Sequence, residues 1–211
     1  MVKSYLSRLC ALAILVASFQ APLYAQEKKD APQRDKSLDD PLDPFDIFGF
    51  DELLSSTDDK DKTAEELIRD ASLLLATERP LDARTKLLKA IQKDPNEYKA
   101  YYLLAGYYLV HVGHYRLALK YIKRAQELFE KKNGPPPYSS HLLQLEHGNL
   151  IYYLSQIRLN LDNYQGALDA LDLFHSYGYR AEWYPSSRSW ILMKLGRIQE
   201  AIKVAREGLI S

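Results

Sequence analysis

The sequence predicts an all-α fold, a solenoid of antiparallel helix pairs. From about residue 63 onward, apolar residues recur three and four positions apart, which is the spacing of a buried helix face. In residues 99–125, a tight turn at Gly113 and His114 separates two such faces. One small residue recurs at the same place in each pair, at Ala83, Ala118, Ala167 and Ala201. The spacings of 35, 49 and 34 residues indicate a repeat of about 34 residues with one insertion.

Residues 1–25 have the layout of a secretory signal peptide. Lys3 and Arg8 form a basic start, residues 9–19 an apolar centre, and Ala25 a small residue at the cleavage point. The apolar run is shorter than the roughly 20 residues that a membrane-spanning helix needs. We therefore expect export to the periplasm or cell envelope, with secretion as the alternative, and no stable membrane span after cleavage. The only cysteine, Cys10, lies in this leader, so the mature chain would form no disulfide.

Residues 26–62 carry 12 acidic and 6 basic residues without helix or strand periodicity, which predicts a disordered acidic tail. A Phe-rich island at residues 44–54 interrupts this tail. Its candidate docking motif consists of Phe45, Ile47, Phe48 and Phe50. Two interpretations stay open: the island packs on the outside of the first repeat, or it docks in a groove of this protein or of another.

The helical-repeat domain, residues 63–211, divides into units of about 64–97, 99–132, 148–178 and 182–211. In the second unit the first helix has an inner stripe of Tyr102, Ala105, Gly106 and Leu109, and the second helix has one of Ala118, Ile122 and Ala125. In the fourth unit, residues 183–187 indicate a loop, so we expect its first helix to begin near Ser186 or Ser187.

An insertion covers residues 131–147. Asn133 and Gly134 are typical of a helix end, and the three prolines that follow prevent its continuation. Ser139 or Ser140 can then cap a new helix, which makes the first helix of the third unit about two turns longer than usual. Its projecting leucines, at 142, 143 and 145, need cover from a neighbouring helix or a partner.

These four units resemble the tetratricopeptide repeat (TPR) family over about residues 63–211. The chain departs from the family pattern at Asp70, Arg158, Pro185 and Arg188. The resemblance implies a right-handed superhelix whose first helices line a concave, peptide-binding groove. By this register the groove residues are Ile68, Ser72, Leu75, Leu103, Tyr107, Val110, His111, Tyr152, Gln156 and Leu159.

This predicted groove is apolar and aromatic and lacks the Lys, Asn and Arg residues with which the family clamps a C-terminal carboxylate. It should prefer an apolar or aromatic peptide segment or helix. The alternative is that the same residues only pack under the tail or under the extended helix of the third unit.

No residue pattern indicates catalysis, a metal site or a cofactor. His111 and His114 lie three residues apart, whereas a zinc pair on a helix needs a spacing of four and further ligands. The formal net charge is zero, and no strongly basic patch indicates nucleic-acid binding. We expect a non-enzymatic protein.

The function predicted is that of an exported scaffold or assembly factor that holds a protein partner in the cell envelope. Two alternatives are an accessory subunit of an envelope enzyme or secretion complex, and a carrier of a small ligand such as a glycan or lipid. The last helix would leave Ala205, Leu209 and Ile210 partly uncovered. Either the array is cut short at residue 211, or this helix contacts a partner or forms a dimer.

Overall fold

The computed structural model describes residues 59–210, and every regular element in that range is helical. The helices are α4 (Ala64–Ala76), α5 (Pro80–Lys93), α6 (Tyr98–Tyr107), the π-helical turn η2 (Tyr108–Val112), α7 (Tyr115–Asn133), α8 (His141–Asn160), α9 (Tyr164–Ser176), α10 (Trp183–Lys194) and α11 (Ile198–Ile210). The predicted signal peptide, and the acidic tail up to residue 58 with its island, lie outside the described residues.

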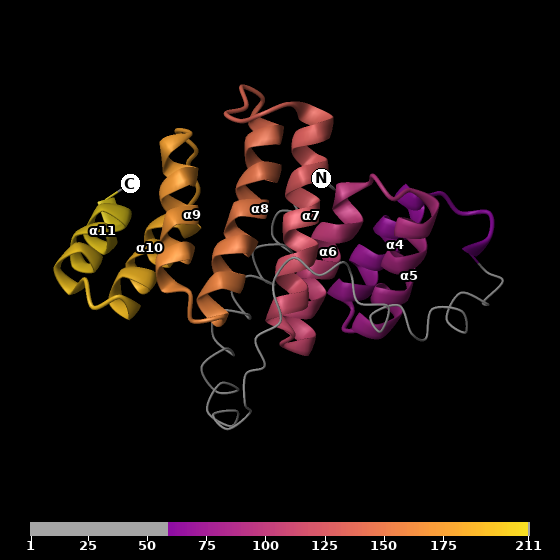
Figure 1. Cartoon of the computed structure of the whole chain (residues 1–211), viewed down its shortest axis with the longest axis horizontal. Helices are drawn as coiled ribbons and strands as arrows, with labels where there is room; N and C mark the ends of the chain where they lie inside the picture. Colours follow the sequence, from indigo (N-terminus) through magenta and orange to yellow (C-terminus); the bar gives the residue numbers. More distant parts are fainter. Residues whose placement is uncertain (1–58, 211) are drawn as a thin grey trace.

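Consecutive helices form four pairs: α4 with α5, α6 with α7, α8 with α9, and α10 with α11. The second helix of each pair packs on the first helix of the next, and the pairs follow one another along the long axis (Figure 1). First helices also touch each other, α4 against α6 and α6 against α8. They therefore share one side of the array, which we call the first-helix face. This architecture confirms the predicted all-α solenoid.

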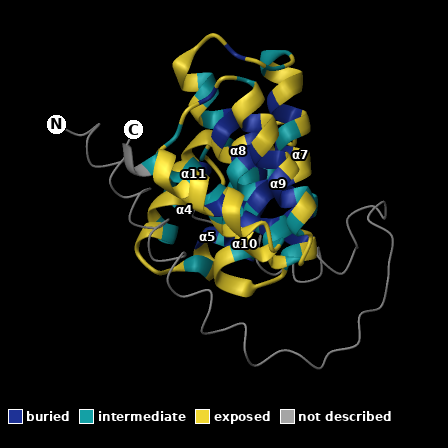
Figure 2. Ribbon diagram, turned by 90° about the vertical axis from the view of Figure 1, so that its left-hand side faces the viewer, coloured by how far each residue is buried: buried dark blue, intermediate teal, exposed yellow. Residues whose placement is uncertain are grey.

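The core runs between the two layers of helices (Figure 2). One large cluster joins α4 through α9, and a smaller one joins α9, α10 and α11 around Leu171, Ile191 and Leu192. The recurring alanines of the second helices are all buried, at positions 83, 118, 167 and 201. A small side chain there lets the two helices of a pair approach closely, which explains the repeat seen in the sequence.

The second pair differs from the predicted register by one residue. Tyr102, Gly106 and Leu109 of the predicted stripe are half-buried, and only Ala105 of it is buried. The buried residues of this first helix are Tyr98, Ala100, Tyr101, Leu104, Ala105, Tyr107 and Tyr108. The cause is η2, because a π-helical turn holds one residue more than an α-helical turn. A prediction that extends an ordinary α-helix back from Gly113 therefore places each residue of this helix one position away from its true place on the helix face.

The fourth pair begins earlier than expected, since α10 starts at Trp183 and not near Ser186. Pro185 is the third residue of α10, and the amide hydrogens of the first turn have no partner within the helix. A proline there costs no helical hydrogen bond. Residues 183–187 therefore form the first turn of the helix and not a loop.

The insertion separates α7 from a long helix α8. The helix α7 ends at Asn133, Gly134 follows at φ +82°, and α8 begins at His141, two turns before the expected start of an ordinary unit. Ser140 occupies the N-cap position, but its hydroxyl makes no capping hydrogen bond. The connecting loop is held by Tyr138, whose hydroxyl donates to the carbonyl of Gly134 at 2.6 Å.

A polar cap covers the N-terminal edge of the array. The Asp59 carboxylate, 4% exposed, accepts hydrogen bonds from Lys86 at 2.5 Å and Lys89 at 2.9 Å, both on α5. Lys62 donates to Asp70 of α4 at 2.5 Å. Burial alone would raise the pKa of Asp59, but the two ammonium groups outweigh it and hold the pKa at about 2. None of the helices within residues 59–210 is long and apolar enough to cross a membrane.

Candidate functional site

A run of aromatic rings crosses the first-helix face from α6 to α10. Tyr102 of α6 makes an edge contact with Tyr153 of α8, with ring centroids 4.9 Å apart. Tyr153 contacts Tyr152 at 6.0 Å, and Tyr152 contacts Trp183 of α10 at 4.7 Å. All four rings are half-buried. We call these residues the aromatic run. It joins three successive first helices into one apolar strip.

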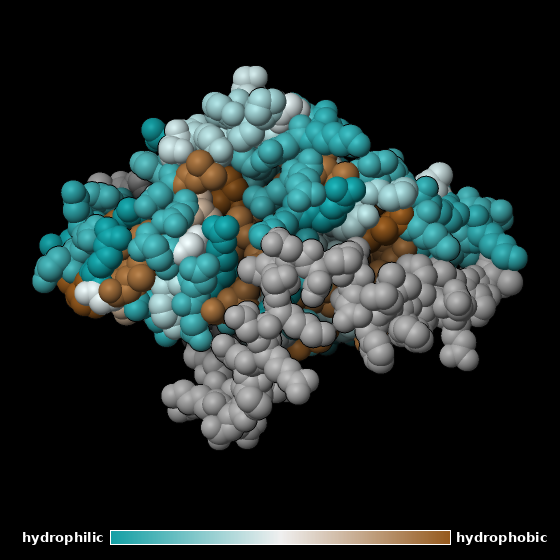
Figure 3. Space-filling view, in the orientation of Figure 1, coloured by the Kyte–Doolittle hydropathy of each residue, from teal (hydrophilic) through white to brown (hydrophobic). Residues whose placement is uncertain are grey.

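Three further apolar side chains, on η2 and α10, are more exposed than the aromatic run. Val110 of η2 is 50% exposed, and Trp190 and Met193 of α10 are 47% and 49% exposed. Trp190 lies two helical turns after Trp183, so both tryptophans are on the same side of α10. Apolar surface is visible around α10 and α11 in the space-filling view (Figure 3). The first-helix face therefore combines a packed aromatic floor with exposed apolar groups.

The structure separates the ten groove residues predicted from sequence into three groups. Ile68 and Tyr107 are buried in the core. Half-buried positions are Leu75, Leu103, Tyr152, Gln156 and Leu159. Exposed positions are Ser72, Val110 and His111. Of these, Tyr152 belongs to the aromatic run, and Val110 is one of the exposed apolar side chains. The predicted docking motif, Phe45, Ile47, Phe48 and Phe50, lies outside the described residues.

Local contacts explain several of these placements. The Ser72 hydroxyl donates to the carbonyl of Ile68 at 2.9 Å, within its own helix. Tyr107 is turned inward by the register shift at η2 and makes an edge contact with Tyr108 at 5.0 Å. The ring of His111 lies 6.0 Å from that of Tyr107, and partial desolvation of the imidazole lowers the pKa of His111, although the residue as a whole is exposed.

Sequence reasoning missed Tyr102, Tyr153, Trp183, Trp190 and Met193 as residues of this face. The apolar spacing predicts Tyr102 in the core, because it does not reveal the extra residue of η2. The residues around Trp183 predict a loop.

Some charged groups of the first helices have local partners. Lys99 of α6 pairs with Glu146 of α8 at 3.6 Å, and the ammonium group of Lys194 lies 5.0 Å from the ring centroid of Trp190. Within residues 59–210, no group of three or more His, Cys, Asp or Glu side chains could hold a metal ion. The arrangement is suited to burying apolar groups of a ligand.

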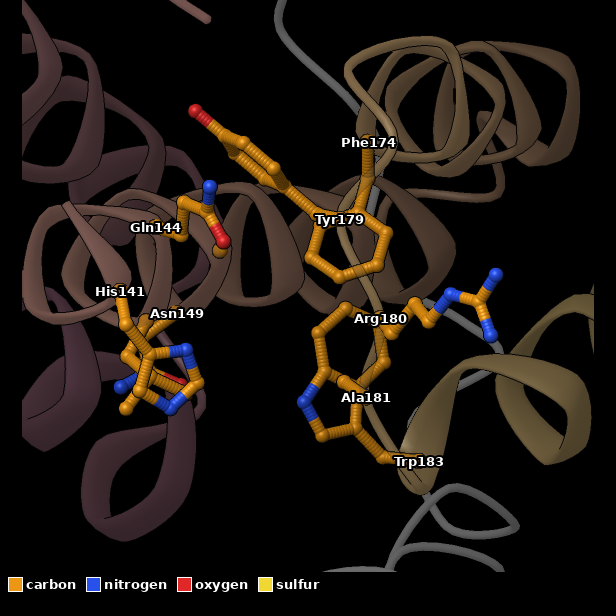
Figure 4. Close-up of a pocket in the computed structure, with 10 residues that line it drawn as sticks. His141, Gln144, Asn149, Phe174, Tyr179, Arg180, Ala181 and Trp183 are labelled. Atoms are coloured by element: carbon orange, nitrogen blue, oxygen red, sulfur yellow. The ribbon is translucent and has the colours of Figure 1, made fainter. Parts of the chain in front are cut away.

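Two cavities lie near the C-terminal half. The first, about 30 Å³, lies between α8 and the segment that precedes α10, with Gln144 on one side and Trp183 on the other (Figure 4). It can hold a water molecule or two but no organic ligand. The second, about 360 Å³, opens between α9, α10 and α11 and is lined by His175, Tyr184 and Glu207, among others.

Comparison with known proteins shows a likeness in fold. No family model and no curated protein matches this chain. Among solved structures, 17 chains match, and one of them is the crystal structure of MamA, a TPR-like helical-repeat protein. It is 18% identical, with a TM-score of 0.57 over 77% of this chain and 84% of that chain. Together with the helix pairs and their packing, this likeness shows an all-α, TPR-like helical-repeat fold.

Proposed function

We propose that this protein is a TPR-type interaction scaffold that binds an apolar, aromatic-containing segment of a protein partner on its first-helix face. One observation carries this proposal: the aromatic run joins α6, α8 and α10, and the apolar side chains Val110 of η2 and Trp190 and Met193 of α10 are about half exposed. A monomer gains nothing from exposing these groups, whereas a partner that covers them removes apolar surface from water.

The magnitudes favour a peptide with several anchors. Fully burying one large apolar side chain contributes about 1.5–3 kcal/mol, whereas association costs at least about 4 kcal/mol in lost freedom of motion. A single Phe or Leu would therefore bind too weakly to hold. We expect three or four apolar side chains in the bound segment, spaced to follow α6, α8 and α10.

The setting that we propose is the cell envelope, with the protein as a scaffold or assembly factor. This part rests on the layout of residues 1–25 alone. Determining the N-terminal sequence of the protein isolated from a periplasmic extract tests it. A mature N-terminus at Gln26 supports export, and an intact leader on protein recovered from the cytosol contradicts it.

Tryptophan fluorescence gives a direct binding assay, because both tryptophans of the chain, Trp183 and Trp190, lie on the proposed face. The probes are 15-residue peptides with three or four Phe, Leu or Ile residues, and polar peptides of equal length serve as negative probes. We expect saturable shifts in emission with the apolar peptides only.

A pair of variants then locates the binding surface. Val110→Asp places a carboxylate on the first-helix face and should weaken peptide binding at least tenfold. Leu81→Asp is the matched control, because Leu81 is 72% exposed but belongs to the second helix α5. Equal loss in both variants, or no binding of any apolar peptide, would contradict the proposal. Binding of a glycan or lipid in place of peptides would favour the carrier alternative.

The helix α11 provides a second proposed contact surface. Ile198 and Ile202, one turn apart, are exposed on it. We propose a dimer or partner contact there, which sedimentation analysis of the wild type and of Ile202→Asp can test. A monomeric wild type at high micromolar concentration would exclude the dimer.

A further inference from the structure

The chain enters the helical body at a fixed point. Asp59 is buried between Lys86 and Lys89 of α5, and Lys62 is paired with Asp70 of α4. Lys93 adds hydrogen bonds from its ammonium group to the carbonyls of Lys60 and Lys62. Residues 59–62 therefore lie against the first helix pair, at the edge of the array opposite α11 (Figure 1). The segment that precedes residue 59 must start from this edge.

The distance along the chain decides which surfaces that segment can reach. Leu54 and Phe45 precede Asp59 by 5 and 14 residues. An extended chain spans at most about 3.5 Å per residue, so Leu54 lies within about 17 Å of Asp59 and Phe45 within about 50 Å. Packed helices are about 8–10 Å apart. The first helices α4, α6 and α8 are thus within reach, whereas α11 is at the far end of the array.

The chemistry of the segment matches that of the face. Residues 44–54 contain six large apolar side chains, and their acidic neighbours belong to a tail with 12 acidic and 6 basic residues. The body from residue 63 onward carries 20 basic and 16 acidic residues. Aromatic and apolar groups on the first-helix face offer the contacts, and the opposite net charges of tail and body favour the approach.

We propose that residues 44–54 occupy the first-helix face of their own chain, so that a partner must displace them. This inference rests on the proposed function, because it assigns an internal competitor to the same surface. A short tether gives the segment an effective concentration of about 1 mM. A segment with a dissociation constant of about 0.1 mM would then weaken partner binding about tenfold.

The test measures binding of a fluorescein-labelled peptide that copies residues 40–54. It uses the full-length chain, the triple variant Phe45→Ala, Phe48→Ala and Phe50→Ala, and the control Leu38→Ala, which alters the tail outside the island. We expect the triple variant to bind the peptide about tenfold more tightly than the wild type and the control. Equal affinity for all three chains would overturn the inference and leave the proposed function standing.

Other results separate the two proposals. If the copied peptide binds no chain but other apolar peptides bind all chains equally, the inference fails and the proposed function holds. If no apolar peptide binds the triple variant, the proposed function itself fails.

A photo-crosslinker at position 48 gives an independent test of the inference. Crosslinks within one chain to α6 or α8 support the inference, and crosslinks only between chains or to α11 overturn it.

Discussion

His147 lies inside a cage of aromatic rings between α7, α8 and the segment before α10. Its imidazole is stacked on Phe129 at 5.8 Å and makes edge contacts with Tyr138 at 5.2 Å and Tyr179 at 5.8 Å. The Tyr179 hydroxyl accepts a hydrogen bond from the amide of Tyr138. Its own hydrogen can therefore point to His147 Nδ1, 3.4 Å away. This arrangement suits a neutral histidine and ties the insertion loop to the core.

We expect His147 to make stability depend on pH. Burial lowers the pKa of His147 from 6.5 to about 4, and the side chain is only 2% exposed. Between these two pH values the unfolded chain binds a proton that the folded chain does not. The free energy of unfolding should therefore fall by about 3 kcal/mol as the pH drops from about 6.5 to about 4. Urea unfolding curves at pH 7, 5.5 and 4 measure this loss.

The variant His147→Phe keeps an aromatic ring but removes the titrating group, so most of this pH dependence should disappear. His141→Gln is the control, because His141 is an exposed histidine on the same helix. If His147→Phe retains the wild-type dependence on pH and His141→Gln loses it, the assignment to the buried cage is wrong.

At the scale of single elements, η2 can be tested by deletion. Removing His111 leaves Tyr101, Leu104 and Tyr108 in register with the core and allows an ordinary α-helix to reach Gly113. We expect the shortened chain to fold, with a melting temperature within a few degrees of the wild type. Deleting Gln156 from the regular helix α8 is the control. It should abolish cooperative unfolding, because it rotates half of the helix by about 100°.

Circular dichroism melts distinguish the two deletions. Loss of folding in both variants would show that the fold needs the extra residue of η2. Equal tolerance in both would show that helix register matters little in this core.

The N-terminal cap gives a second prediction at this scale. The pKa of Asp59 is about 2 in the folded chain against an ordinary value of 3.8. The stabilisation of the folded chain by ionised Asp59 is therefore present above about pH 4 and is lost as the pH falls toward 2. Asp59→Asn should lower the free energy of unfolding at pH 7 by about 2 kcal/mol. Asp61→Asn, at an exposed neighbouring position, should change it by less than about 0.5 kcal/mol.

At the scale of the whole molecule, the two ends of the array differ. The first pair belongs to the large core cluster and is covered by the polar cap at Asp59. The pair α10–α11 is held by the smaller cluster, and Trp190, Met193 and Ile202 are exposed on it. In a repeat array, stability is approximately a sum of each unit and its contacts with neighbouring units.

Hydrogen exchange should reveal this difference. We expect amides in α10 and α11 to exchange through local opening, at lower free energy than those in α6, α7 and α8. Exchange followed by mass spectrometry at neutral pH measures the protection of each helix. Equal protection along the array, at the level of global unfolding, would contradict this expectation. Added protection of α10 in the presence of a bound peptide would support the proposed binding face.

The sequence allowed most of the architecture to be predicted, because local signals carry it. The small residues at Ala118 and Ala167 fix the crossing of each helix pair, and Gly113 and Gly134 end helices at positive φ. The candidate face could be predicted only in part. Of the predicted groove residues, Tyr152 is half-buried within the aromatic run and Val110 is exposed, whereas Ile68 and Tyr107 are buried in the core.

By itself, the sequence determined an all-α array of four helix pairs in which the first helix of the third pair is unusually long. Apolar periodicity and turn residues are local properties, so they can be recognised in the sequence without knowledge of the tertiary contacts. Only the tertiary structure decided the rotation of α6, the start of α10 and the alignment of Tyr102, Tyr153, Tyr152 and Trp183. These depend on how helices far apart in the chain pack on each other. One extra residue in η2 changes which side of α6 faces the core, although the apolar spacing in the sequence is compatible with both registers.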